Sequence, residues 1–416
     1  MKKLTWVLVV SLLAGCGPDK VPPVQMMVMM LSPKGVYEPK RAALGSLTNV
    51  SAFSGSVATL VGGSRIIIDP GDPALAAAPN LTDEQLANVF VKAKGIPPRG
   101  SYVENNGVLW PADFHTWNMA TTYYNFEKAF EYFQAIGLKT EEVGTSTVYY
   151  FPYYVALELG TNPIEDNALF FSPIRAFAVL PFNRLQTVPL SMNYGVIAHE
   201  YSHRVFNLRT YQGKSIPEPI VRWAGFTVSP GVNLLKSMDE GLADWNAYGA
   251  TCISEYGCNP RFLGASLSQT ETDLRDLSKP DKCLTAAMKK NIDQLSASDF
   301  SRQGFEYRVG TVLASALYHA AAKTGQRQVL QASVLSAYSD TSPATPGFAQ
   351  LVVNNLTTPE GFNLPAVANS ILQHITDPTL KKETCSQFMD RLKIKKEDMK
   401  DCPTSTIVDK AACPDL

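Results

Sequence analysis

Two of the five histidines in this chain lie four residues apart, in the segment HEYSH at residues 199–203. Positions i and i+4 lie on one face of an α-helix, so a helix here lets His199 and His203 reach one metal ion while Glu200 flanks the open coordination position. A surface helix with two solvated histidines is the alternative. The apolar residues at 194–198 argue against it, because they predict that the helix is buried.

An acidic pair follows downstream, in the segment MDEGLADW at residues 238–245. Helical spacing places Glu240 and Asp244 on one face. Two histidines leave a tetrahedral zinc ion in need of one more protein ligand and a water molecule, and Glu240 can complete such a site. Asp244 can accept the second ring N–H of a ligand histidine and so fix its tautomer. Taken alone the pair would be a solvated helix face, but downstream of HEYSH we interpret it as the rest of a zinc site.

These two motifs, HExxH followed by EGxxD, resemble those of the gluzincin metallopeptidases, and the flanking segments are similar to the thermolysin and fungalysin type. The resemblance covers residues 114–325. It implies that Glu240 is the third zinc ligand and that Asp244 orients His199. It also implies an α+β, two-lobed fold, with a mixed α/β upper lobe at 101–208 that ends with the zinc helix, and a mainly helical lower lobe at 209–416. We interpret residues 16–100 as a tether and a small, β-containing accessory region.

Two further segments resemble the substrate-binding parts of the same family. NALF at residues 167–170 resembles an Asn-Ala-aromatic edge strand, which implies that Asn167 and Ala168 pair with the substrate backbone. LRDLSKP at residues 274–280 resembles a segment whose arginine holds a substrate carbonyl, which assigns that role to Arg275. The resemblance therefore implies a cleft that runs along the edge strand between the two lobes.

The sequence departs from the family at two places. Thirty-six residues separate His203 from Glu240, more than the family's usual spacing, and the proline-bearing stretch 215–230 predicts an inserted loop near the cleft. The family's oxyanion-stabilising histidine, shortly before a glycine, is replaced in the segment EYRVG at 306–310 by Tyr307. A phenol can donate a hydrogen bond to a developing oxyanion, and Arg308 is a competing donor. The remaining histidines (His115, His319 and His374) have no partners that suggest metal ligation.

Together these parts predict a zinc endopeptidase that acts on peptides or proteins. Zinc lowers the pKa of its bound water toward about 7 and polarises the scissile carbonyl, while Glu200 accepts the proton of the water and passes it to the leaving amine. An aminopeptidase is the nearest alternative, but residues 100–105 lie too far upstream and do not match the amine-binding GxMEN element. The other alternative is a non-catalytic surface lipoprotein that keeps the fold as a binding or assembly module. The presence of Glu200 argues against it, because a structural zinc site does not need a general base.

The N-terminus resembles a bacterial lipoprotein signal. Lys2 and Lys3 precede an apolar run at 4–13, which is shorter than the roughly 20 residues of a membrane-spanning helix, and LAGC ends at Cys16. We expect a signal peptide at 1–15, lipidation of Cys16, and an acyl anchor in the bacterial cell envelope, at the outer membrane because Gly17 is no inner-membrane retention signal. A plain secretory signal would leave Cys16 as an orphan thiol. The net charge of −1 excludes a nucleic-acid partner.

Six cysteines remain, which in an oxidising compartment allow three disulfides. Proximity favours a Cys252–Cys258 bridge and one bridge among Cys385, Cys402 and Cys413. The periodicity of apolar residues predicts the other elements: a buried strand at 24–31, a hairpin at 57–69 around a Gly-Gly turn, a helix capped by Thr82 and Gln85, an aromatic core helix at 114–136, strands at 148–155 and 169–180 (the latter an edge strand because of Pro173), and helices at 196–208, 234–250, 311–322, 328–338 and 365–375.

Overall fold

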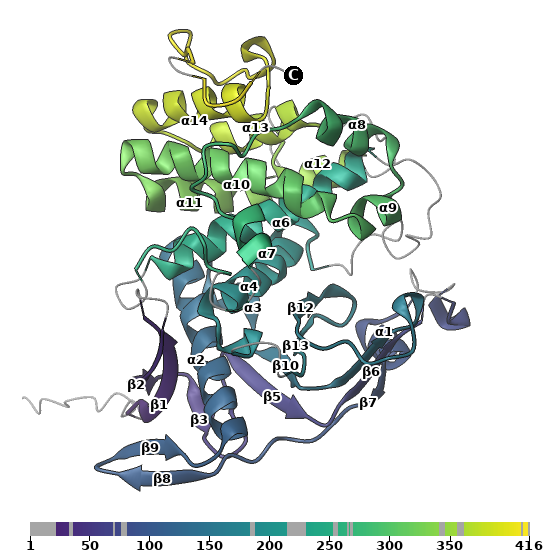
Figure 1. The fold of residues 1–416 in the computed structure, drawn as a ribbon, viewed down its shortest axis with the longest axis vertical. Coiled ribbons are helices and arrows are strands. Elements are labelled where there is room, and N and C mark those ends of the chain that lie inside the picture. Colours follow the sequence, from purple (N-terminus) through teal and green to yellow (C-terminus); the bar gives the residue numbers. More distant parts are fainter. Residues whose placement is uncertain are drawn as a thin grey trace, which may run out of the picture.

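The computed structural model describes residues 22–32, 36–69, 71–75, 81–183, 188–213, 230–252, 257–263, 266, 269–340, 346–355, 362–408 and 411–414. In these residues the protein is mixed α+β, with its strands in the N-terminal part and mostly helices after residue 190 (Figure 1). Cys16 and the predicted signal peptide lie outside the described residues, as does the predicted inserted loop up to residue 229. No described helix is long and apolar enough to cross a membrane.

The largest sheet of the described residues has six strands in the order β12-β13-β10-β5-β4-β3. Its strands are β3 (Leu47–Asn49), β4 (Ser54–Gly55), β5 (Ala58–Gly62), β10 (Ser146–Tyr150), β12 (Ala168–Phe171) and β13 (Ala176–Val179). The single edge strand predicted at 169–180 is wrong, because the chain turns at Ser172–Ile174 and forms two strands. β12 lies at the edge of the sheet, as predicted for residues 167–170, and pairs antiparallel with the internal strand β13. Pro173 lies in the short turn between them, where its missing N–H removes no bond from the sheet.

The hairpin predicted at 57–69 is wrong. β5 pairs in parallel with β10, whereas the next strand, β6 (Arg65–Ile68), pairs in parallel with β11 (Tyr153–Ala156) in a separate sheet that β7 (Val91–Ala93) completes. The two paired segments change direction at matching positions. The β5–β6 connection bends at Gly63, with φ 70°, and the β10–β11 connection bends at Phe151, with φ 48°. Gly63 therefore redirects a strand from one sheet to another and does not reverse it.

The N-terminal region shares its sheets and core with the segment after residue 100. β1 (Val24–Leu31), the predicted buried strand, pairs with β2 (Tyr37–Leu44) and with β9 (Val108–Pro111), and β8 (Tyr102–Asn105) completes this four-stranded sheet. β5 lies inside the six-stranded sheet, and Met26 and Leu60 belong to the same hydrophobic core as Phe126. The boundary predicted at residue 100 therefore divides all three sheets of the described residues. Pairing between strands so far apart is not visible in local sequence.

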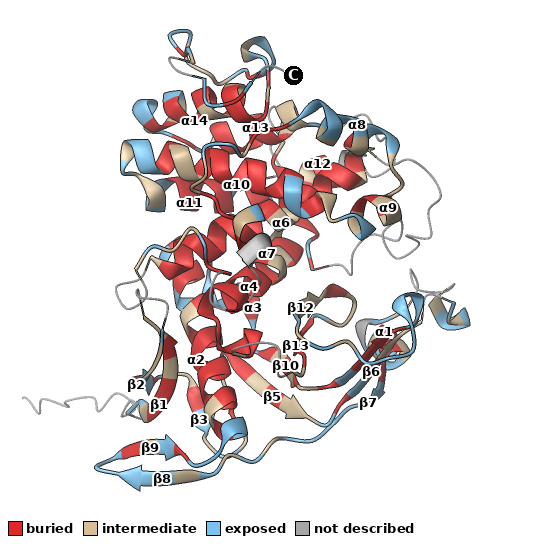
Figure 2. Cartoon of the chain, in the orientation of Figure 1, coloured by how far each residue is buried: buried red, intermediate tan, exposed pale blue. Residues whose placement is uncertain are grey.

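Long buried helices join the sheets to the C-terminal part (Figures 1 and 2). α2 (Phe114–Ala135) carries the aromatic residues predicted for the core, and α4 (Tyr194–Thr210) packs on it. α1 (Asp83–Phe90) has the predicted Thr82–Gln85 capping box, and α3 (Thr140–Val143) precedes β10. The helices that follow are α6 (Pro230–Thr251), α7 (Gln269–Leu274), α8 (Ala286–Gln294), α9 (Ala297–Arg302), α10 (Phe305–Thr324), α11 (Arg327–Ser339), α12 (Phe348–Asn355), α13 (Leu364–Leu372) and α14 (Pro378–Arg391).

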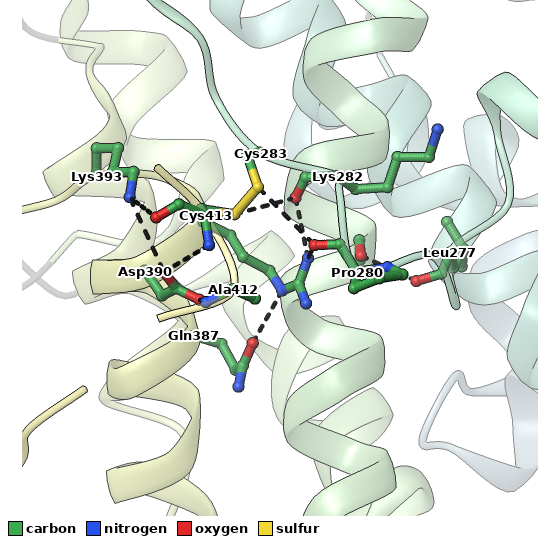
Figure 3. The surroundings of a disulfide bond; sticks show 11 residues. Leu277, Pro280, Lys282, Cys283, Gln387, Asp390, Lys393, Ala412 and Cys413 are labelled. Atoms are coloured by element: carbon green, nitrogen blue, oxygen red, sulfur yellow. Dashed lines mark hydrogen bonds and ion pairs between the residues drawn. A yellow bond between two sulfur atoms is a disulfide. The ribbon is translucent and has the colours of Figure 1, made fainter. Parts of the chain in front are cut away.

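Three disulfides lie in the described helical part. Cys252–Cys258 is the predicted bridge, and Cys385–Cys402 is the bridge expected within the C-terminal trio. The third joins Cys283 to Cys413, across 130 residues. Figure 3 shows how Asp390 and Lys393 of this region bond the C-terminal segment beside the bridge. The C-terminal segment is therefore fastened to the chain between α7 and α8.

Candidate metal centre

Helices α4 and α6 pack against each other and supply the ligands of the centre. α4 begins after the N-cap Asn193, whose side chain accepts hydrogen bonds from the backbone amides of Gly195 and Val196. The cap fixes where the helix begins, and helical spacing then places His199 and His203 on the same face, toward α6. α6 presents Glu240 to the same point. His199, His203 and Glu240 are the described residues whose ligand atoms lie close enough together to hold a metal ion.

The spacing of the ligand atoms fits a tetrahedral metal ion. The two Nε2 atoms are 3.1 Å apart, and Glu240 Oε2 lies 3.2 Å from Nε2 of His199 and 3.6 Å from Nε2 of His203. Zinc bonds of about 2.0–2.1 Å in tetrahedral geometry place ligand atoms about 3.3 Å apart. Glu240 Oε2 is also buried and accepts no hydrogen bond from a described residue. The three side chains can therefore hold a metal ion.

A carboxylate behind each histidine fixes the ring. His199 Nδ1 lies 3.0 Å from Asp244 Oδ1, as the sequence predicts, and His203 Nδ1 lies 2.8 Å from Asp239 Oδ1. A proton held on each Nδ1 leaves the Nε2 lone pair free for a metal ion. The sequence analysis did not predict this role for Asp239. Its position directly before the ligand Glu240, in MDEGLADW, could have indicated it.

The electrostatics of this cluster are suited to binding a cation. Burial lowers the pKa of His203, but Asp239 and Glu240 outweigh burial and raise the pKa well above its usual value. Burial opposes ionisation of Glu240 as well, yet the two histidines hold its pKa well below the usual range. His199 and His203 thus favour their protonated forms, whereas Glu240 stays ionised.

Glu200 lies on α4 between the two histidines and faces the edge strand. Its Oε2 accepts a hydrogen bond of 2.8 Å from the backbone N–H of Phe170 in β12. Burial raises the pKa of Glu200, partly offset by the histidines. The strand therefore orients a carboxylate whose affinity for a proton is increased, as a general base requires.

The edge strand directs backbone groups toward the same space. Leu180 N–H donates to the carbonyl of Asn167, so Asn167 faces β13, and in an antiparallel ladder Ala168 and Phe170 face the other side. The Phe170 N–H is taken by Glu200 and the Ala168 N–H by the Asn167 side chain. This leaves the outward carbonyls of β12 as the acceptors that line the cleft.

Arg275 and Tyr307 line the same cleft as the metal ligands and β12. Arg275 Nε donates to Asp244 Oδ2 over 3.1 Å, so this arginine holds the carboxylate that orients His199. Its guanidinium carbon lies 4.6 Å from the centre of the Tyr307 ring. The Glu240 carboxylate raises the pKa of Tyr307 well above its usual value, which keeps the phenol a proton donor. Arg308 also lines the cleft, and its guanidinium lies over Phe305.

A glycine pair sets the distance between Glu240 and Tyr307. At the crossing of α6 and α10, a Cβ added to Gly241 would lie 2.3 Å from the Gly310 carbonyl oxygen, and one added to Gly310 would lie 2.4 Å from the Ser237 carbonyl oxygen. The two backbones are therefore in direct contact. This contact brings the first turn of α10, with Tyr307, against the ligand Glu240.

The other three histidines lie outside the centre, as the sequence predicts. His115 Nδ1 is 3.0 Å from the Tyr150 hydroxyl, and His374 Nε2 is 3.1 Å from Asp340. His319 is partly buried on α10, and burial lowers its pKa. None of the three belongs to a metal-ligating group within the described residues.

A cleft of about 720 Å³ contains the whole arrangement. Among the described residues, those predicted for the site all line it except Asp244, which is 1% exposed and lies behind His199. The cleft also contains Lys236, Ser301 and Glu306, which the sequence did not indicate. No protein-family model matches the chain, and no curated protein matches it.

Proposed function

We propose that the protein is a zinc-dependent endopeptidase. The convergence of His199, His203 and Glu240 at tetrahedral spacing, with Glu200 beside the open side, is the observation that carries this proposal. Two nitrogens and one carboxylate oxygen form a donor set typical of catalytic zinc, which keeps one position for water or substrate. A structural zinc site would be closed by a fourth protein ligand.

The resident zinc ion would supply a Lewis acid that polarises a carbonyl and acidifies a water molecule. The protein's own groups perform the rest. Glu200, oriented by Phe170 N–H, accepts a proton from the attacking water and transfers it to the leaving amine. Tyr307 donates its phenolic hydrogen to the developing oxyanion, with Arg308 as the alternative donor. Arg275 retains Asp244 and so keeps His199 in its tautomer.

The substrate we propose is an extended peptide chain lying along β12. The outward carbonyl of Ala168 accepts a backbone N–H from it, and the side chain of Asn167 offers an amide for its orientation. The proposed architecture has an upper lobe that ends with α4 and a lower lobe of helices from α6 onward, with the cleft between them. The lipid anchor on Cys16 and the location in the bacterial envelope are proposals that rest on the N-terminal sequence.

Glu200→Gln tests the proposal, because it keeps the size and the hydrogen bond to Phe170 but cannot take a proton. The variant should bind one equivalent of zinc, as wild type does, and should lose cleavage of casein or of a labelled peptide by at least about a hundredfold. The surface substitution Glu131→Gln is the matched control. Zinc binding by wild type without chelator-sensitive cleavage would favour the non-catalytic alternative, and cleavage by Glu200→Gln at the wild-type rate would refute the mechanism.

A further inference from the structure

A second polar cluster lies in the cleft, beside the metal ligands. Lys236 is one helical turn before Glu240 on α6, Ser301 is on α9, and Glu306 is next to Tyr307 in the first turn of α10. Lys236 Nζ donates a hydrogen bond to Ser301 Oγ, and Ser301 in turn hydrogen-bonds the Glu306 carboxylate. Lys236 and Ser301 are therefore the polar neighbours of Glu306 in the cleft.

One oxygen of Glu306 lacks a donor. Glu306 is 8% exposed, and its Oε2 is buried and accepts no hydrogen bond from the described residues. Among the described residues, the other carboxylate oxygen in this condition is Oε2 of Glu240, which faces the metal site. Both line the same cleft. A buried acceptor without a donor is costly, so a hydrogen-bond donor brought by a molecule in the cleft would stabilise Glu306.

The chemistry of the acceptor selects the partner. An ionised carboxylate only accepts hydrogen bonds, and its strongest partners are charged N–H donors. Burial raises the pKa of Glu306 and Lys236 opposes the rise, so the carboxylate is only partly compensated by the protein. A second cation at Oε2 would complete the compensation.

We propose that Glu306 forms a subsite for a cationic nitrogen of the peptide substrate, beside Tyr307. This proposal rests on the proposed function, because it takes a peptide as the occupant of the cleft. The nitrogen belongs either to a basic side chain or to the free α-amino group of a short peptide. The chemistry is the same, and the experiment separates the two sources.

Calorimetric binding to Glu200→Gln protein, with and without zinc, tests the subsite without turnover. Three peptides of equal length serve as probes: an N-acetylated peptide with norleucine next to the scissile bond, the same peptide with lysine there, and the norleucine peptide with a free amino terminus. We expect the peptide that carries the correct cation to bind about ten- to a hundredfold more tightly than the neutral peptide, as for a charge-assisted hydrogen bond. Adding Glu306→Gln should abolish this difference and leave the neutral peptide unchanged. Adding Glu131→Gln should leave it intact.

The outcomes are separable. A preference for lysine assigns a side-chain subsite, and a preference for the free terminus assigns an amine site. Equal binding of all three peptides, no binding of any, or a preference that survives Glu306→Gln overturns the subsite. If Glu306→Gln lowers the melting temperature, Glu306→Asp, which retains the charge, should restore part of the preference. Zinc-dependent cleavage by wild type without preference for either cation would refute the subsite alone, and absence of cleavage would refute the proposed function alone.

Discussion

Asp239 offers the sharpest test of how the centre is built, because Asp239→Asn changes a single contact. The carboxylate accepts the Nδ1 hydrogen of His203 over 2.8 Å, with both side chains largely buried. Asparagine can offer an oxygen in the same place but without the charge. A hydrogen bond to a charged group is worth about 1.5–3 kcal/mol and a neutral one about 1 kcal/mol. The difference of roughly 1.4 kcal/mol corresponds to about tenfold weaker zinc binding. Asp239→Ala removes the acceptor entirely and should cost up to about a hundredfold.

Zinc affinity is measured by competition with a fluorescent chelator at fixed pH, and stability by thermal unfolding of the metal-free protein. Asp239→Asn should lower metal-free stability, because the protonated His203 loses the carboxylate that raises its pKa, but by less than Asp244→Asn does. Asp244→Asn is the informative comparison, because Asp244 is 1% exposed and also pairs with Arg275. It should weaken zinc binding and in addition destabilise the fold by about 3–5 kcal/mol, since a buried guanidinium loses its partner. Wild-type zinc affinity in Asp239→Asn, or a loss of stability as large as that of Asp244→Asn, would refute the assigned role.

Three further predictions follow from pKa, packing and topology. In the metal-free protein the pKa values of His199 and His203 lie above 6.5, so their protonation stabilises the fold fully below that pH, and this stabilisation is lost as pH rises through the raised pKa values. Zinc binds only the neutral rings, so the difference in melting temperature between zinc-loaded and chelated protein should widen as pH rises. A difference that narrows with pH would contradict the assignment. Gly310→Ala should destabilise the protein by about 1–3 kcal/mol in denaturant titrations, because the added Cβ forces α10 away from α6, whereas Gly45→Ala, in open space, should not. Deletion of residues 22–100 should leave a chain that neither unfolds cooperatively nor retains zinc, because it removes an internal strand of the six-stranded sheet; a folded deletion variant would restore the idea of a separable accessory region.

The metal ligands could be found from sequence because their geometry is mostly local. His199 and His203 face the same side of one helix by the helical period alone, and so do Glu240 and Asp244. That α4 and α6 approach each other does not follow from either motif alone. It was inferred from the resemblance, which implies that Glu240 joins the two histidines as a ligand. The core helix at 114–136 was equally accessible, since its aromatic residues repeat at helical spacing and bury themselves.

Strand pairing was not accessible in this way. Apolar strands on both sides of Gly62 and Gly63 indicate a hairpin as strongly as they indicate a strand that changes sheets. The deciding partners, β10 and β11, lie more than eighty residues later, and nothing in the local sequence specifies them. For the same reason the sequence did not show that the region before residue 100 belongs to the same sheets as the rest. β5 pairs in parallel with β10, and a parallel pair has no local turn that would reveal it.

The residues that sequence missed in the cleft, Lys236 and Glu306, depend on one helix crossing. Contact between the backbones at Gly241 and Gly310 brings the first turn of α10 to α6, and successive residues of that turn then point in different directions. Tyr307 is brought next to Arg275 and Glu240, whereas Glu306 is directed toward Ser301 and Lys236. One packing contact therefore places the proposed oxyanion donor and the proposed cation subsite together. A substitution of either glycine should disturb both, whereas Glu306→Gln should remove the preference of the cleft for a cationic peptide.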